Sequence, residues 1–589
     1  MGEGHGGRGK LGMRGLSVFT HPRRPPTEQP TSAGHRSGFR IAAAWVITVL
    51  AFLLVWFALV GPDQVGALTP GAFVRIPLEA LLFVGAVLLL PPRAGRIAAV
   101  AVGVALGLLA MVKVLDMAVF AALSRPFDPM VDGGYFGSAV GVLGDSIGRT
   151  DAIVATVAAA LAAVAVLVFA PLAVLRLTRI LGRHRTTSLR AIMALGVVWA
   201  LCAVAGAQLV PDAPLASTSA AGLAADEVGR VYAGIKDQQS FAKTAAVDAF
   251  RNTSGADLLT GLRGKDVIVA FVESYGRVAV QGSAFSPQVD AVLDSDTRRL
   301  KAAGFSAKSG FLTSPTFGGI SWLAHSTLQS GLWIDNQLRY NDLVTSDRFT
   351  LSDAFKRAGW RTVSDVPADD VYWPQGKSFY HYDKLYNSLN VGYVGPKFSY
   401  APVPDQYTLS TFQRLELAKP NRARVMAEMD LVSSHTPWAP LPHMIGWNQL
   451  GDGSVFNSMP AQGQSPDVVW RQPSQVQAAY GQSIQYSLNA LISFVETYHD
   501  KNLVLVVLGD HQPATIVSGQ GGNHDVPITI ISHNPAVMDR ISPWGWQDGM
   551  RPSPDAPVWP MDAFLDRFLN AYGPHPPATP LLSDAATKR

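Results

Sequence analysis

The fold is decided by the run Val267-Ile-Val-Ala-Phe-Val-Glu273, an apolar, β-branched stretch that ends in a carboxylate. A second run of this kind, Leu503-Val-Leu-Val-Val-Leu-Gly509, is followed by Asp510-His511. Such runs are typical of buried strands. In an open α/β sheet, ligands bind outside the carboxyl ends of the strands. We therefore expect Glu273, Asp510 and His511 to meet at one sheet edge as ligands of a metal ion.

The second half of the chain alternates short apolar runs with amphipathic stretches. Alternation of this kind predicts an α/β domain with a mostly parallel sheet. We place this domain at 261–575. The expected strands lie at 267–272, 428–432, 503–508 and 526–532, and the expected helices at 289–303, 351–358 and 475–499.

A hydroxyl residue lies between the two strand ends in sequence. Ser321 follows Phe317-Gly-Gly-Ile320 and opens an apolar-periodic segment, which predicts a helix whose N-terminus faces the site and favours anions. A serine hydroxyl is a weak nucleophile until a base or a metal ion activates it. Ser321 is thus a candidate nucleophile and metal ligand, although a simple N-cap role stays open. Thr313, Ser314 and Thr316 are rival nucleophiles.

Three histidines lie close to these elements in sequence. His435 follows an apolar strand in Val432-Ser-Ser-His-Thr-Pro-Trp438, and His524 precedes the strand that begins near Val526. Either imidazole could protonate a leaving oxygen near neutral pH. For His435 the alternative is a loop histidine packed on aromatic rings. His325 lies one helical turn after Ser321 and is a candidate for binding the substrate anion.

The first half of the chain is dominated by Ala, Val and Leu. Five segments are long enough to cross a bilayer, which needs about 20 apolar residues each. We place a five-span membrane domain at 40–210, with spans near 40–61, 72–91, 96–123, 151–176 and 189–210. The only cysteine, Cys202, lies in the last span, which excludes an intrachain disulfide and a Cys-rich zinc site.

Basic residues predict the orientation of these spans. Arginines and lysines concentrate in the tail at 1–39 and in the second and fourth loops, which places those segments in the cytoplasm. With five spans, everything after about 211 is then extracytoplasmic. The polar tail at 1–39 is expected to be disordered. Residues 211–260 are expected to form a helical juxtamembrane linker, and 576–589 a flexible tail.

The motifs described above resemble those of a known family, the alkaline phosphatase/sulfatase superfamily. The resemblance is strongest to its membrane-bound lipoteichoic acid synthase-like and phosphoethanolamine transferase-like branch. The sulfatase pattern C/S-x-P-x-R-x-x-L-x-T-G matches here with Ser321 as nucleophile, followed by Leu328, Ser330 and Gly331. Leu323 and His325 replace the Pro and the Arg of that pattern. This departure argues against a sulfatase that carries formylglycine and favours an unmodified hydroxyl nucleophile.

The resemblance also implies roles for single residues. Glu273 is similar to the first metal acid of the family, and Asp510 and His511 to its paired ligands. His435 is similar to a substrate-contacting histidine, and Trp373 in Val-Tyr-Trp-Pro-Gln-Gly-Lys377 to a tryptophan that contacts the headgroup. The arginine expected near that tryptophan is missing, and Lys377 stands as its replacement.

Together these features predict a multi-pass plasma-membrane enzyme with a sulfatase-like outer domain. One divalent ion, Mn²⁺ or Mg²⁺ with Zn²⁺ as the alternative, would be held by Glu273, Ser321, Asp510 and His511. We expect transfer of a phosphoglycerol- or phosphoethanolamine-type headgroup from a membrane lipid to a glycan or other envelope acceptor through a phospho-Ser intermediate. A hydrolase (a phosphodiesterase or an atypical sulfatase) and a non-catalytic membrane scaffold are the alternatives. No nucleic-acid partner is expected.

Overall fold

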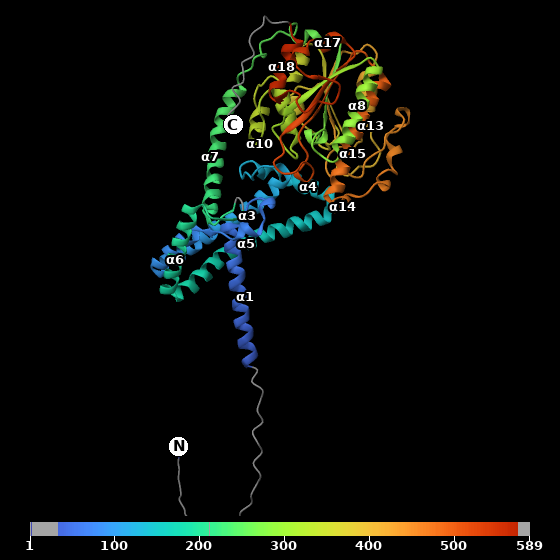
Figure 1. The fold of residues 1–589 in the computed structure, drawn as a ribbon. Helices are drawn as coiled ribbons and strands as arrows, with labels where there is room; N and C mark the ends of the chain where they lie inside the picture. Colours follow the sequence, from blue (N-terminus) through green and yellow to red (C-terminus); the bar gives the residue numbers. More distant parts are fainter. Residues whose placement is uncertain (1, 3–32, 211–212, 575–589) are drawn as a thin grey trace, which may run out of the picture.

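The structure, a computed structural model, describes residue 2 and residues 33–210 and 213–574. Bundled apolar helices occupy one end of the molecule and a layered α/β domain the other, with the long helix α7 (Ser219–Ala245) beside both (Figure 1). Most of the tail expected at 1–39, residues 211–212 of the expected linker and the tail expected at 576–589 lie outside the described residues.

A mixed sheet of nine strands forms the centre of the α/β domain. Its strand order is β12-β6-β11-β10-β5-β9-β7-β8, and β13 pairs with β6. The five strands from β10 to β8 are parallel, whereas β11 runs antiparallel to both β10 and β6. The expectation of a mostly parallel sheet is therefore not confirmed as stated, although the strands that carry the candidate site do run parallel. The strands are β5 Asp266–Val272, β6 Ser306–Thr313, β7 Arg361–Val366, β8 Lys384–Asn387, β9 Val425–Leu431, β10 Leu503–Gly509, β11 Asp525–Ser532, β12 Gln547–Asp548 and β13 Val558–Pro560.

Helices cover both faces of this sheet. Alternate residues of a strand point to opposite faces, so β5 sends Ile268, Ala270 and Val272 into one core and Val267, Val269 and Phe271 into the other. The first core is closed by α8 (Ser286–Ala302), α13 (Asp405–Phe412) and α15 (Pro473–Tyr498). The second is closed by α9 (Ser321–Ser330), α10 (Gln337–Val344), α11 (Leu351–Arg357), α17 (Pro535–Asp539) and α18 (Ala563–Tyr572).

Four helices of the first half are long and apolar enough to cross a membrane within the described residues. They are the segment Phe39–Val60 of α1 (Ala33–Val60), α3 (Pro92–Leu123), α5 (Arg149–Arg183) and α6 (Arg185–Ala205). The segment expected to be the second span instead holds α2 (Leu78–Leu89), a helix of 12 residues. At 1.5 Å per residue, α2 falls short of the roughly 30 Å apolar core of a bilayer. Five spans are therefore not confirmed.

The two halves of the molecule contact one another at the C-terminal end of α3. Thr515 Oγ1, on the short helix α16 (Thr515–Ser518), donates a hydrogen bond to the carbonyl of Ala121 at 2.6 Å. The backbone of Gly318 lies so close to α3 that a Cβ there would stand 1.8 Å from the carbonyl oxygen of Ala122. Helix α7 adds a bidentate pair, Asp237 with Arg339 of α10, at 2.7 Å for both contacts. The turn that precedes Ser321 therefore packs directly on the apolar half.

Candidate active site

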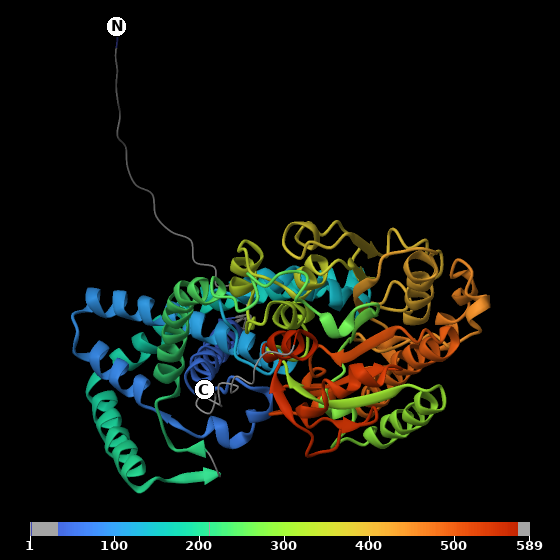
Figure 2. The same cartoon turned by 90° about the horizontal axis from the view of Figure 1, so that it is seen from above.

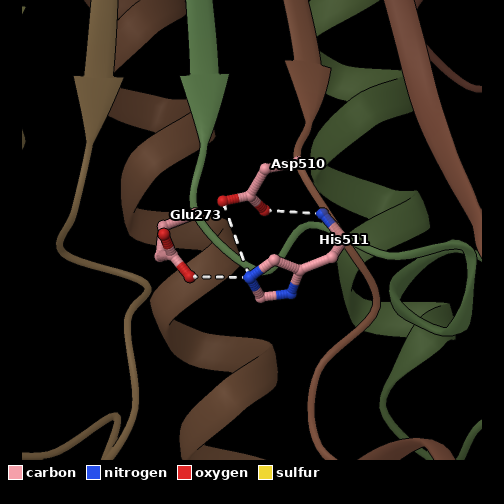
Figure 3. A group of neighbouring side chains, drawn as sticks. All are labelled: Glu273, Asp510 and His511. Carbon is pink, nitrogen blue, oxygen red and sulfur yellow. Dashed lines mark hydrogen bonds and ion pairs between the residues drawn. The ribbon is translucent and has the colours of Figure 1, made fainter. Parts of the chain in front are cut away.

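Two neighbouring parallel strands deliver the predicted metal ligands to one edge of the sheet (Figure 3). Glu273 follows β5, and Asp510-His511 follows β10, whose Gly509 pairs with Val272. His511 Nε2 lies 3.3 Å from Glu273 Oε1 and 3.8 Å from Asp510 Oδ2. All three residues are buried and offer ligand atoms close enough to share one ion.

Ser321 completes this group. Its Oγ donates a hydrogen bond to Glu273 Oε2 at 2.9 Å and lies 3.1 Å from His511 Nε2. We call Glu273, Ser321, Asp510 and His511 the nucleophile cluster. Ile320, the residue before Ser321, has φ 67° and ψ 44°, a left-handed conformation that is strained for a β-branched side chain. Strain of this kind gathers at functional sites, and here it aims the first residue of α9 at the two strand ends.

The rival hydroxyls are engaged elsewhere. Thr313 donates to a carboxylate oxygen of Asp525 at 3.0 Å, and Ser314 donates to the backbone carbonyl of Asp510 at 2.5 Å. Thr316 Oγ1 lies 3.4 Å from the Ser314 hydroxyl. The geometry therefore favours Ser321 over these three as the nucleophile.

Burial and mutual charge shift the titration of the three ligands. Burial would raise the pKa of Glu273, but the hydrogen bond from His511 and the positive charges of His435 and His511 hold it well below its usual value. Burial and the adjacent Glu273 raise the pKa of Asp510 to about 8. Burial opposes the charge of His511, yet Asp510 and Glu273 raise its pKa to about 9.

These side chains fit a divalent cation. Two carboxylates, an imidazole and a hydroxyl are a donor set that such ions accept. Asp510 Oδ2 is buried and has no hydrogen-bond partner among the described residues, as expected of an atom whose partner is a metal ion. A cation among these atoms would offset the negative charge of the two buried carboxylates.

The two candidate acid–base histidines pack on different aromatic rings. His435 stacks on Tyr400 with ring centroids 3.5 Å apart, and its Nδ1 lies 2.5 Å from the carbonyl of Thr436. It is close enough for its charge to lower the pKa of Glu273. His524 packs on Phe317, and burial lowers its own pKa. Both roles remain predictions.

Trp373 and Lys377 line a separate cavity of about 280 Å³, whose lining includes no member of the nucleophile cluster. The Trp373 ring packs beside Tyr380, at 5.4 Å between centroids. Lys377 donates to the backbone carbonyl of Tyr382 at 2.8 Å and also to that of Asp383. Burial lowers the pKa of Lys377. None of these contacts reaches the nucleophile cluster, and the substrate-binding roles of both residues remain predictions.

His325 does lie on the Ser321 side of α9, but it meets two acids that the sequence analysis missed. Its Nδ1 lies 3.8 Å from Glu428 Oε1 and 3.6 Å from Asp430 Oδ1, and its ring stacks on Phe271 at 3.9 Å. Burial lowers the pKa of His325 to about 3, so the ring is neutral at pH 7. The missed signal was the alternation Glu428-Met-Asp430, which puts two acids on one face of a buried strand.

A cavity of about 410 Å³ opens where the two halves of the molecule meet. Its walls come from the end of α3 and the loop after it, from α7, and from the α/β domain. The lining includes Arg125, Thr316, Phe317, Arg339 and His524. The cavity thus lies along the glycine-rich turn that carries Ser321.

Comparison with known proteins finds no matching family model and no match among curated proteins. The solved structures do give matches. The integral membrane lipooligosaccharide phosphoethanolamine transferase A from Neisseria meningitidis has 11% identity and a TM-score of 0.43, over 88% of this chain and 94% of that one. The lipoteichoic acid synthase LtaP from Listeria monocytogenes has 13% identity and a TM-score of 0.37, over 57% of this chain and 78% of that one. The Streptococcus pyogenes phosphoglycerol transferase GacH, in complex with sn-glycerol-1-phosphate, has 13% identity and a TM-score of 0.32, over 57% and 90%.

At these identities and TM-scores the matches assign no residue role and no substrate to this chain. Residue roles rest instead on the geometry of its own side chains. By the names they carry, the matched proteins are a lipoteichoic acid synthase, a phosphoglycerol transferase and a phosphoethanolamine transferase.

Proposed function

We propose that this chain is a membrane-anchored, metal-dependent phosphotransferase. It moves a phospho-headgroup of phosphoglycerol or phosphoethanolamine type from a membrane lipid to a glycan or other envelope hydroxyl. One observation carries the proposal: Ser321 Oγ contacts both Glu273 and His511 at the carboxyl ends of two parallel strands. A carboxylate and an imidazole here can hold one metal ion beside a hydroxyl group. This arrangement is suited to nucleophilic attack of the hydroxyl oxygen on phosphorus.

The nucleophile cluster would hold one divalent ion through Glu273, Asp510, His511 and Ser321 Oγ. When bound, such an ion lowers the pKa of the serine hydroxyl and stabilises negative charge on the phosphoryl group. Its donor set suits Mn²⁺ or Mg²⁺, and Zn²⁺ is the alternative.

Transfer would take two displacements at phosphorus. Ser321 loses its hydroxyl proton to solvent, and its Oγ forms a bond to phosphorus while the bond from phosphorus to the lipid oxygen breaks. That oxygen leaves with a proton from His435 or His524. An acceptor hydroxyl then attacks phosphorus and gives its proton to the same histidine. The bond from phosphorus to Ser321 Oγ breaks, and Oγ takes back a proton from solvent.

The layout suits a lipid donor. The cavity of about 410 Å³ borders both the end of α3 and the turn before Ser321, so a headgroup could reach the site while its acyl chains stay beside the apolar helices. We place the α/β domain outside the plasma membrane and the N-terminus in the cytoplasm, because the basic loops favour this orientation. This orientation needs an odd number of crossings, so the apolar segment that holds α2 would have to cross in addition to the four long helices.

The test is intact-mass analysis and peptide mapping of the full chain in detergent, incubated with Mn²⁺ and a mixture of anionic and zwitterionic lipids. We expect an adduct on Ser321 whose mass identifies the headgroup, and no adduct in Ser321→Ala. Thr313→Ala is the matched control, because its hydroxyl bonds Asp525 instead of the nucleophile cluster.

The other outcomes each refute part of the proposal. Ester hydrolysis without any adduct would indicate a hydrolase. Bound metal with neither adduct nor hydrolysis, or no bound metal at all, would support a non-catalytic scaffold.

A further inference from the structure

We propose that His325, Glu428 and Asp430 form a second divalent-cation site beside the nucleophile cluster. We call these three residues the β9 cluster. They come from two elements, because Glu428 and Asp430 lie on β9 and His325 lies on α9, one turn after Ser321. Each offers one ligand atom, and the three atoms all lie within 4.8 Å of one another. This site goes beyond the single ion that the proposed transfer reaction needs.

The spacing inside the β9 cluster suits an ion better than a hydrogen bond. His325 Nδ1 lies 3.8 Å from Glu428 Oε1 and 3.6 Å from Asp430 Oδ1. Both separations exceed the roughly 3.2 Å limit of a good N–H···O bond. Two ligands that each lie about 2.1 Å from one ion stand roughly 3–4 Å apart, which matches both separations.

Two buried atoms of this group lack hydrogen-bond partners among the described residues. They are Asp430 Oδ1 and His325 Nε2. Buried polar atoms are almost always satisfied, so each needs an explanation. A cation between the carboxylates and Nδ1 would give Asp430 Oδ1 its partner, whereas Nε2 would carry the ring proton and would still need an acceptor.

The charged side chains around Glu428 and Asp430 also favour a bound cation. Within the part of the chain that the structure describes, His325 is the only basic side chain that lies within ion-pair distance of Glu428 or Asp430. The two acids therefore share one imidazole, with no lysine or arginine beside them among the described residues. Burying unpaired carboxylates is costly unless they bind metal or hold protons. A neutral imidazole and two carboxylates are ligands that Mn²⁺ and Zn²⁺ both accept.

Neighbouring side chains already hold the ligands in position. Tyr382 donates to Glu428 Oε2 at 2.9 Å, and Gln329 donates to the same oxygen, which leaves Oε1 facing His325. Phe271 stacks on the His325 ring and fixes its plane. Outer partners that orient ligands in this way are typical of metal sites. Asp430 is the most exposed of the three side chains, so water or a substrate oxygen could complete the coordination there.

Metal counting tests this inference on the full chain in detergent, equilibrated with MnCl₂ and freed of unbound ions. We expect two Mn²⁺ per wild-type chain and one in Asp430→Asn or Glu428→Gln. We also expect one in Asp510→Asn and none in the double variant Asp430→Asn/Asp510→Asn. The matched control is Asp365→Asn, which removes a buried carboxyl from the neighbouring strand β7 and should keep both ions.

Several results would overturn the inference. One ion in the wild type that only Asp510→Asn removes would show that the β9 cluster holds protons instead of metal. Two ions that persist in Asp430→Asn would place the second ion elsewhere. If Asp430→Asn loses its thermal unfolding transition, His325→Gln replaces it, because that variant keeps both carboxyls; two ions in His325→Gln would equally refute the site. A wild-type chain that binds an ion at the β9 cluster but none that depends on Asp510 would count against the proposed function and not against the second site.

Discussion

The nucleophile cluster and the β9 cluster use similar side chains in different settings. Each takes one residue from α9: Ser321 belongs to the first, and His325, four residues later, belongs to the second. In the first, Ser321 Oγ lies at hydrogen-bond distance from Glu273 and His511, and its acids follow the ends of their strands. In the second, the acids lie inside β9 and stay beyond hydrogen-bond distance of His325. Residues that follow a strand can reach a substrate, whereas residues within a strand are held by the packing of the sheet. We therefore expect the nucleophile cluster to be the reacting group and the β9 cluster to support it.

The largest expected effect is on the rate of transfer. Asp510→Asn removes a ligand of the nucleophile cluster and should slow formation of the Ser321 adduct more than about 10³-fold, in the upper range for loss of a group that stabilises the transition state. Asp430→Asn should slow it by about 10–100-fold, because it acts through a neighbouring site. Single-turnover measurement at saturating Mn²⁺ gives both rates. Equal losses would show that the two clusters work as one.

The two clusters also differ in how far the sequence could predict them. Glu273 and Asp510-His511 were predictable because each follows an apolar, β-branched run, and a strand end defines where the side chains gather. Ser321 was predictable from the glycines before it and the helical pattern after it. The β9 cluster was not recognised, because Glu428 interrupts an apolar run and the pairing of β9 with β5 is a long-range property.

The same reasoning explains the errors in the fold. Parallel and antiparallel strands have similar patterns when both faces are buried, so the reversed direction of β11 between β10 and β6 was not visible in the sequence. The segment at 72–91 is apolar throughout, yet Pro77 precedes the first turn of α2, and the helix covers only Leu78–Leu89. Composition therefore predicted an apolar segment correctly, but a fifth span is not confirmed.

A third carboxyl makes the comparison sharper through its pH dependence. Asp365 on β7 is buried, and burial raises its pKa from 3.8 to about 7. The folded chain then keeps this proton between pH 4 and 7 while the unfolded chain loses it. Stability from this group is complete below pH 4, falls as pH rises, and is lost above about 7, a change of about 4 kcal/mol.

Thermal unfolding in detergent at several pH values measures this slope. Asp365→Asn should flatten the decrease of Tm between pH 4 and 7, and the size of this effect should not depend on Mn²⁺. Added Mn²⁺ should instead stabilise the wild type at the upper end of this range, because ions bind the ionised acids of both clusters. An unchanged slope in Asp365→Asn would mean that Asp365 is ionised in the folded chain.

The smallest effect that we predict concerns the contact between the turn before Ser321 and the apolar helices. Gly318 has φ 73°, and a Cβ there would meet the carbonyl of Ala122 at 1.8 Å. Gly359 has φ 95° but open space around its Cβ position, so it is a matched control for backbone strain alone.

Gly318→Ala must displace either the end of α3 or the turn that aims Ser321. A displacement of about 1 Å costs up to roughly 10²-fold in rate, so adduct formation should fall by 10- to 100-fold in Gly318→Ala and stay within about 3-fold of wild type in Gly359→Ala. Because the β9 cluster lies one turn further along α9, Gly318→Ala should still bind both Mn²⁺ ions. Equal rates in the two variants would mean that the apolar helices anchor the site without positioning its nucleophile.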